Sequence, residues 1–325
     1  MRFALCAYGD AYAGMLLTCL HSIRRSNADA DVSVFWQDIS PRLADALKQA
    51  FPEVEFVKTT FAMHRDYDRA ISQKVLLWYE VVARHEGEDL CLLDTDTLVT
   101  GEVAAHLPAA AQIAYTVRPG KWAINTGVML VRGAHTAAFF AAWRDLTIEI
   151  VESDDQSAAA LRQYGGMDQM SFARLVQYDQ GMPTTQVEAG GHTFTCTALS
   201  GDVLNQTRPV DEPTTAAILH YKGAWQNLLL KGQSISSTPD GAEREPMYEL
   251  YLQTFVEALA RVHAHRPALP GAAFGVRVPF YFDADLRPRP GRRRAFHYLE
   301  ILYRWCGDAH LAPAAALLER LIFRH

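Results

Sequence analysis

Two aspartates separated by one residue, Asp94 and Asp96, follow an apolar run at 90–93. The run, Leu-Cys-Leu-Leu, is typical of a strand buried on both faces of a parallel sheet, and ligands bind beyond the carboxyl ends of such strands. Side chains at positions i and i+2 of an extended chain point to the same side, so both carboxylates can face one ligand. Because two negative charges about 6–7 Å apart repel each other unless a cation lies near them, the spacing predicts a divalent-cation site. The alternative is that Asp94 caps a turn and Asp96 is solvated.

A lysine interrupts the apolar stripe of a helix predicted at 68–84. Lys74 falls between Ile71 and Trp78 on that stripe. Burying an ammonium group without a partner is costly. Either the side chain snorkels from the edge of the stripe, or it points along the sheet toward a phosphate.

Two later segments combine glycine with polar side chains. Asn125, Thr126 and Gly127 precede an apolar half-strand, where a glycine allows a ligand to approach the backbone closely. Asp168 and Gln169 follow two glycines at the start of a predicted helix. Asp168 stands where an N-cap belongs, which is the alternative to a binding role.

Strands and helices that alternate along the chain must position these groups. The predicted strands are 2–7, 32–36, 54–57, 90–93, 112–117, 128–131 and 216–219. The predicted helices are 15–25, 41–50, 68–84, 137–152, 165–175, 246–263, 295–305 and 313–323. The alternation predicts an α/β fold with a doubly wound sheet and right-handed crossovers.

Composition limits the class of protein. With 325 residues, 49% of them apolar and 21% charged, the chain can bury a large core. Its net charge of −6 argues against nucleic acid as a partner. The five cysteines are odd in number and lack paired spacing, which indicates free thiols in a reducing compartment. Since no segment has the pattern of a signal peptide or a membrane span, we expect a cytoplasmic protein.

The C-terminal part differs in character from the rest of the chain. A polar stretch at 232–243 predicts a loop or linker, and helices separated by a proline-rich stretch follow it. Three arginines at 292–294 precede several aromatic residues. Such a cluster either docks on anionic lipid headgroups, as a peripheral membrane contact, or is a solvated helix end.

Four motifs occur in an order that resembles GT-A glycosyltransferases, above all the retaining galactosyltransferase and glycogenin-like family (family 8). They are Asp94-Thr95-Asp96, Asn125-Thr126-Gly127, Gly166-Met167-Asp168-Gln169 and His220-Tyr221-Lys222-Gly223-Ala224-Trp225. The resemblance implies a Rossmann-like, mostly parallel sheet flanked by helices. It covers residues 1–230 as the catalytic domain and leaves 231–325 as a helical extension, where the acceptor site is expected.

The resemblance also implies roles for particular residues. Asp94, Asp96 and His220 would hold Mn²⁺ or Mg²⁺, and an imidazole ligand favours Mn²⁺. The implied residues of the nucleotide-sugar site are Ala7, Tyr8, Asp10, Tyr12, Lys74, Asp94, Thr95, Asp96, Asn125, Thr126, Lys222 and Gly223. Among them, Tyr12 would stack on uracil, and Lys222 and Gly223 would face the diphosphate. The implied catalytic residues are Asn125 and Asp168, on the hydroxyls of the donor sugar, and Gln169, on its β-face.

The implied reaction moves a hexose from a nucleotide sugar, expected to be UDP-linked, to a hydroxyl of a saccharide, lipid-linked or protein acceptor. Gln169 is a poor base, which favours retention at the anomeric carbon, with the leaving phosphate accepting the proton of the acceptor. Asp168 as the base of an inverting enzyme is the alternative. Two positions depart from the family pattern: Gly9 stands where an acidic residue is usual, and Gln226 where a lysine is usual.

Three other classes use similar residues. In a haloacid-dehalogenase-like phosphatase, Asp94 would be the nucleophile and Asp96 the acid and base, but that motif lies near the N-terminus, whereas three β-α units precede Asp94 here. A nucleotidyltransferase would need a glycine-rich, basic first loop, which 7–12 lacks. A non-catalytic sugar-nucleotide-binding protein would leave the metal ligands unexplained.

Overall fold

The computed structural model describes residues 1–62, 64, 66–120, 123–178, 182–207, 213–221, 246–267, 269 and 271–274. Several sequence-based expectations fall outside these residues. They are Lys222, Gly223, the polar stretch 232–243, the basic-aromatic cluster and the two helices predicted at 295–305 and 313–323.

The described strands and helices follow the predicted alternation. The strands are β1 (Arg2–Tyr8), β2 (Val32–Gln37), β3 (Glu55–Lys58), β4 (Leu90–Asp94), β5 (Thr97–Val99), β6 (Ile113–Val117), β7 (Ile124–Val131), β8 (Thr184–Ala189), β9 (His192–Ser200) and β10 (Ile218–His220). The α-helices are α1 (Ala13–Ser26), α2 (Pro41–Ala50), α3 (Tyr67–Ser72), α4 (Lys74–Arg84), α5 (Thr136–Glu152), α6 (Asp154–Gln163), α7 (Met167–Leu175), α8 (Gly201–Leu204) and α10 (Pro246–His265). Short 3₁₀ turns are η1 (Asp10–Tyr12), η2 (Ala104–His106), η3 (Pro213–Thr215) and η5 (Gly271–Phe274).

Eight strands form one mixed sheet in the order β3-β2-β1-β4-β7-β6-β9-β8. Most run in one direction, whereas β7 and β8 are antiparallel to their neighbours. A second, two-stranded sheet pairs β5 with β10. The predicted α/β fold with a mostly parallel sheet is confirmed.

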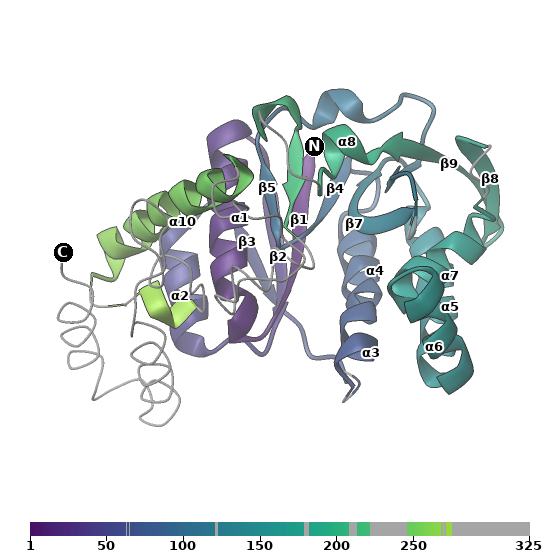
Figure 1. Cartoon of the computed structure of the whole chain (residues 1–325), viewed down its shortest axis with the longest axis horizontal. Helices are drawn as coiled ribbons and strands as arrows, with labels where there is room; N and C mark the ends of the chain where they lie inside the picture. Colours follow the sequence, from purple (N-terminus) through teal and green to yellow (C-terminus); the bar gives the residue numbers. More distant parts are fainter. Residues whose placement is uncertain are drawn as a thin grey trace.

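Helices cover both faces of the large sheet (Figure 1). Successive side chains of a strand point to opposite faces, and β1 shows the consequence. Its residues Phe3 and Leu5 belong to the core beneath α1, α2 and α10, whereas Ala4 and Cys6 belong to the core beneath α4, α5 and α7. A continuous apolar strand is therefore required here, as its sequence predicts.

The segment predicted as one helix at 68–84 is two helices, α3 and α4, which meet at Gln73. The Ser72 hydroxyl donates to the Asp68 carbonyl, a local bond that competes with helix geometry and bends helices. As a result Ile71 is 39% exposed and does not belong to the buried stripe. Lys74 becomes the first residue of α4 instead of an interior one.

Within the described chain, no helix is both long and apolar enough to cross a membrane. The longest described helix, α10, packs instead against α1 and α2. Its residues Met247, Tyr251 and Phe255 are fully buried in the same core as those helices.

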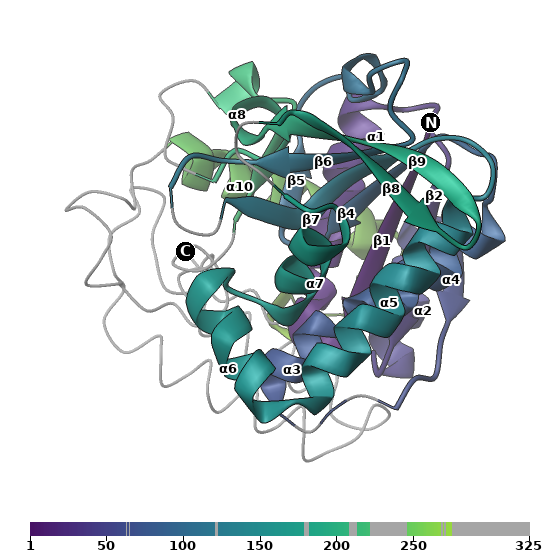
Figure 2. The same ribbon diagram turned by 90° about the vertical axis from the view of Figure 1, so that its right-hand side faces the viewer.

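Strands β8 and β9 form an antiparallel hairpin (Figure 2). The predicted elements do not include it. Its signals are alternating burial over 184–189 and two glycines that separate the strands. Gly190 and Gly191 both have positive φ, at 56° and 78°, as a two-residue hairpin turn requires. The turn lies against α5, since a Cβ added at Gly190 would come 2.7 Å from the Cβ of Ala138.

We expect Gly190→Ala to destabilise the protein more than Gly191→Ala. Both variants strain a positive φ, but only the first forces a methyl group into Ala138, since nothing lies within 4 Å of a Cβ at Gly191. The difference in the free energy of unfolding should be about 1–3 kcal/mol, measured by urea denaturation. Equal losses in the two variants would contradict the packing of the hairpin on α5.

Candidate metal centre and active site

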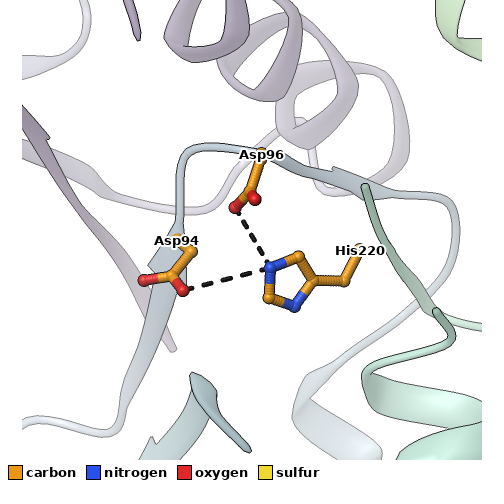
Figure 3. A group of neighbouring side chains, drawn as sticks. All are labelled: Asp94, Asp96 and His220. Atoms are coloured by element: carbon orange, nitrogen blue, oxygen red, sulfur yellow. Dashed lines mark ion pairs between the residues drawn. The ribbon is translucent and has the colours of Figure 1, made fainter. Parts of the chain in front are cut away.

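Asp94, Asp96 and His220 converge at the carboxyl edge of the large sheet (Figure 3). Asp94 ends β4, the chain turns at Thr95 and Asp96, and β5 follows. Because β10 pairs antiparallel with β5, His220 comes opposite Thr97, and the backbone N–H of Tyr221 donates to the Asp96 carbonyl at 2.7 Å. The turn after β4 places the Asp96 carboxylate near that of Asp94, and the pairing of β10 with β5 places His220 beside both. The sequence predicts an extended chain through Asp94 and Asp96, and this prediction is wrong because Thr95 and Asp96 form a turn.

The distances fit a divalent cation. One ligand atom from each of the three residues lies within 4.8 Å of the other two. Nε2 of His220 is 3.1 Å from Oδ1 of Asp96 and 4.0 Å from Oδ2 of Asp94. His220 and Asp96 are buried, and only Asp94 has a partly exposed side chain, at 24%. Carboxylate oxygens with one imidazole nitrogen form a donor set that suits Mn²⁺ and accepts Mg²⁺.

Gly127 on β7 makes room for this group. A Cβ there would lie 2.5 Å from Cε1 of His220, 2.6 Å from Oδ2 of Asp94 and 2.9 Å from Oδ1 of Asn125. The Asn125 oxygen also accepts the N–H of Gly127 at 2.8 Å. The glycine was expected to admit a ligand to the backbone, but the groups that approach it are the protein's own side chains.

Lys74 lies buried between two carboxylates. Its Nζ is 2.8 Å from Oδ1 and 2.9 Å from Oδ2 of Asp94, and 3.6 Å from Oδ2 of Asp168. Burial by itself would lower the pKa of Lys74, but the charges of Asp94 and Asp168 outweigh it, and the pKa is raised. The ammonium therefore stays charged and joins β4 to α7. The snorkelling alternative is wrong.

Asp168 does not cap its helix. The N-cap of α7 is Gly166, without a side-chain cap, and Asp168 is buried in the first turn. Its Oδ2 accepts a hydrogen bond from the Thr126 hydroxyl at 2.6 Å. The Asn125-Thr126-Gly127 motif on β7 is thus in direct contact with Asp168 on α7, as expected if both motifs contribute to one binding site.

Two buried polar atoms, one from an expected catalytic residue and one from an expected nucleotide-sugar residue, have no hydrogen-bond partner among the described residues. They are Oε1 of Gln169 and the hydroxyl of Tyr8. Burial raises the pKa of Tyr8, and the nearby Cys6 and Asp94 raise it further, so the hydroxyl keeps its proton. An unsatisfied buried polar group costs about 1–3 kcal/mol, which a ligand at either atom would recover.

The remaining expected residues lie near the ends of β1 and β4, which are parallel neighbours with Cys6 opposite Asp94. Ala7 is buried near the end of β1, and Thr95 is buried in the turn after β4. Asp10 is exposed and accepts the N–H of Ser40 at 2.6 Å, while Tyr12 ends η1 and packs against the core. These positions agree with ligand binding at the carboxyl edge of an open sheet.

Sequence reasoning missed Asn205, which follows α8. Its Oδ1 lies 2.7 Å from Nδ1 of His220, fifteen positions later in the chain. Its Nδ2 donates to the Thr116 hydroxyl on β6 at 2.6 Å. No periodicity or spacing near Asn205 indicates these contacts, because both partners come from other elements.

Comparison with known proteins identifies the fold. No family model and no curated protein matches the sequence. The structure resembles the glycosyltransferase GlyE of Streptococcus pneumoniae TIGR4 with a TM-score of 0.53 at 15% identity, over 81% of this chain and 63% of GlyE. The apo form of GlyE gives a TM-score of 0.52 at 15% identity, over 82% of this chain and 63% of that one. The galactosyltransferase LgtC, in complex with donor and acceptor sugar analogs, aligns over 79% of this chain and 96% of its own at 15% identity, with a TM-score of only 0.48.

The chain therefore has the fold of a glycosyltransferase, and the expected resemblance is confirmed at the level of the fold. It spans 63% of the length of GlyE. At 15% identity the likeness does not extend to substrates.

We expect Gly127→Ala to weaken the binding of Mn²⁺ at least about tenfold, or about 1.4 kcal/mol. The added methyl group overlaps the His220 ring and the Asp94 carboxylate, so at least one of them must move. The affinity can be measured by electron paramagnetic resonance of free Mn²⁺. Gly101→Ala is the control, because its Cβ would lie 3.4 Å from Cα of Ala217, in ordinary contact. Wild-type affinity in Gly127→Ala would contradict the site.

Proposed function

We propose that this chain is a metal-dependent glycosyltransferase that moves a hexose from a nucleotide sugar, expected to be UDP-linked, to an acceptor hydroxyl. The observation that carries the proposal is the convergence of Asp94, Asp96 and His220 at the carboxyl edge of a glycosyltransferase fold. The acceptor is a saccharide, a lipid-linked sugar or a protein. Residues 1–230 supply the catalytic domain, and the acceptor binds with the help of 231–325.

The charges of the site support a bound cation. Among the described residues, the Lys74 ammonium pairs with the carboxylates of Asp94 and Asp168, while the Asp96 carboxylate lies beside His220. The excess of negative charge would repel a nucleotide diphosphate, so the diphosphate needs a cation between itself and the aspartates. Asp94, Asp96 and His220 would hold Mn²⁺ or Mg²⁺, which would supply Lewis-acid stabilisation for a leaving diphosphate.

The surroundings of Asp168 and Gln169 favour retention. Asp168 already accepts a hydrogen bond from Thr126 and faces the Lys74 ammonium, which leaves it poorly placed to accept the proton of an acceptor. Gln169 cannot ionise, but its buried Oε1, which has no hydrogen-bond partner within the described part of the chain, suits a hydrogen bond to the donor sugar or the acceptor. Asn125 and Asp168 orient the hydroxyls of the donor sugar, and an oxygen of the leaving phosphate accepts the proton.

Asp96→Asn tests this function. We expect the wild-type melting temperature to rise with one UDP-sugar only when Mn²⁺ is present, by an amount that corresponds to about 2.7 kcal/mol at one hundred times Kd. The variant should keep its fold, measured by circular dichroism, but lose the metal-dependent shift and the transfer of sugar. Asp155→Asn, at an exposed carboxylate on α6, is the matched control.

Two outcomes would contradict the proposal at different points. If Asp96→Asn kept undiminished Mn²⁺-dependent nucleotide binding, the assignment of Asp94, Asp96 and His220 as metal ligands would be wrong. A wild-type protein with no metal-dependent response to any nucleotide or sugar nucleotide would remove the glycosyltransferase function itself.

A further inference from the structure

Both ring nitrogens of His220 have a polar neighbour, although the ring is only 2% exposed. Nδ1 lies 2.7 Å from Oδ1 of Asn205, and Nε2 lies 3.1 Å from Oδ1 of Asp96. A neutral imidazole carries one proton, on one nitrogen or the other. The side of the ring that keeps the lone pair decides whether His220 can act as a ligand toward the aspartates.

A chain of buried hydrogen bonds assigns that proton. The Thr116 hydroxyl donates to the backbone carbonyl of Asn125 at 3.0 Å, so its oxygen is available as an acceptor. It accepts from Nδ2 of Asn205 at 2.6 Å, which turns the amide oxygen of Asn205 toward His220. That oxygen can only accept, so Nδ1 of His220 must be the donor. In the neutral form that a histidine ligand takes, the lone pair is then on Nε2, on the side of Asp94 and Asp96.

The backbone holds Asn205 firmly in this position. Its N–H donates to the Gly201 carbonyl at 2.9 Å, and the side chain is only 4% exposed. The next residue, Gln206, bonds to β10 on both sides of Leu219: its N–H donates to Ile218 at 3.0 Å, and its carbonyl accepts from His220 at 2.8 Å. Asn205 and His220 are therefore fixed to each other by their backbones as well as by their side chains.

We propose that Asn205 is a positioning residue for the metal centre, which fixes the ring orientation of His220 and the tautomer with its lone pair on Nε2. This inference rests on the proposed metal-dependent function. Asn205 itself does not touch the cation. A hydrogen-bond partner on the far nitrogen of a histidine ligand orients the ring, and its loss costs about 10–100-fold in metal affinity.

The test compares Asn205→Leu with Asn205→Asp in the full chain. Asn205→Leu removes the acceptor, and its Mn²⁺ affinity, measured by electron paramagnetic resonance, should fall about 10–100-fold. Asn205→Asp keeps an acceptor oxygen toward Nδ1, and its affinity should stay within about threefold of wild type. Asn27→Leu, which removes a different amide contact at Gly101, should leave the affinity unchanged.

A second readout needs no metal. Nitrogen-15 resonances of the imidazole rings, assigned to His220 by comparison with His220→Gln, should show a protonated Nδ1 in the wild type and in Asn205→Asp, but not in Asn205→Leu. This measurement applies even if Asn205→Leu folds poorly, because an unprotonated Nδ1 in the wild type would by itself overturn the inference.

The outcomes distinguish a failure of the Asn205 inference from a failure of the proposed metal-dependent function. If the wild type binds Mn²⁺ and both Asn205 variants bind it equally well, Asn205 does not position His220 and the inference is overturned. Equal weakening in both variants would also overturn it, since that result indicates general damage to packing. If the wild type binds no Mn²⁺, the metal site fails, and the inference fails with it.

Discussion

The balance of charge around Asp94 is the constraint on which the site depends. A carboxylate taken out of water is unfavourable unless another charge or several hydrogen bonds compensate it. Lys74 does so for Asp94 with two contacts below 3 Å, and it reaches Asp168 as well. Because these residues come from α4, β4 and α7, the ion pairs bind one helical layer to the carboxyl edge of the sheet.

Strand pairing and helix packing, in place of ion pairs, hold His220 in position. His220 reaches the aspartates because β10 pairs with β5, directly after the turn that carries Asp96. The next residue, Tyr221, donates from its hydroxyl to the Met247 carbonyl at 2.6 Å, in the first turn of α10. Since α10 shares a core with α1 and α2, the strand that carries the histidine is supported by a helix from the C-terminal part of the chain.

The space around Gly127 is also restricted. Gly127 is the point on β7 where the imidazole, the Asp94 carboxylate and the Asn125 amide all approach the backbone. No side chain larger than hydrogen fits there without displacing one of them. Thr126, whose hydroxyl donates to Asp168, directly precedes this glycine, and the His220 ring that bonds to Asn205 lies against it. The side chains around Gly127 therefore have little room to move.

Local patterns along the chain are sufficient to predict several parts of this protein. Apolar runs such as 90–93 predict buried strands, the alternation of elements predicts the α/β sheet, and Asp94 and Asp96 are recognisable at a strand end. The hairpin of β8 and β9 also carries a local signal, the two glycines with positive φ at its turn. Spacing along the chain is sufficient in these cases, because the forces act within one element.

The contacts of the charged and polar groups, in contrast, depend on how distant segments pack together. The partner of Lys74 is 20 positions away, that of Thr126 is 42 away, and that of Asn205 on β6 is 89 away. His220 reaches the turn that carries Asp96 only because β10 pairs with β5, and Asp168 reaches Lys74 and Thr126 only because α7 lies beside α4 and β7. Electrostatic and hydrogen-bond energies depend on distance in space, and no pattern within a single segment records that distance.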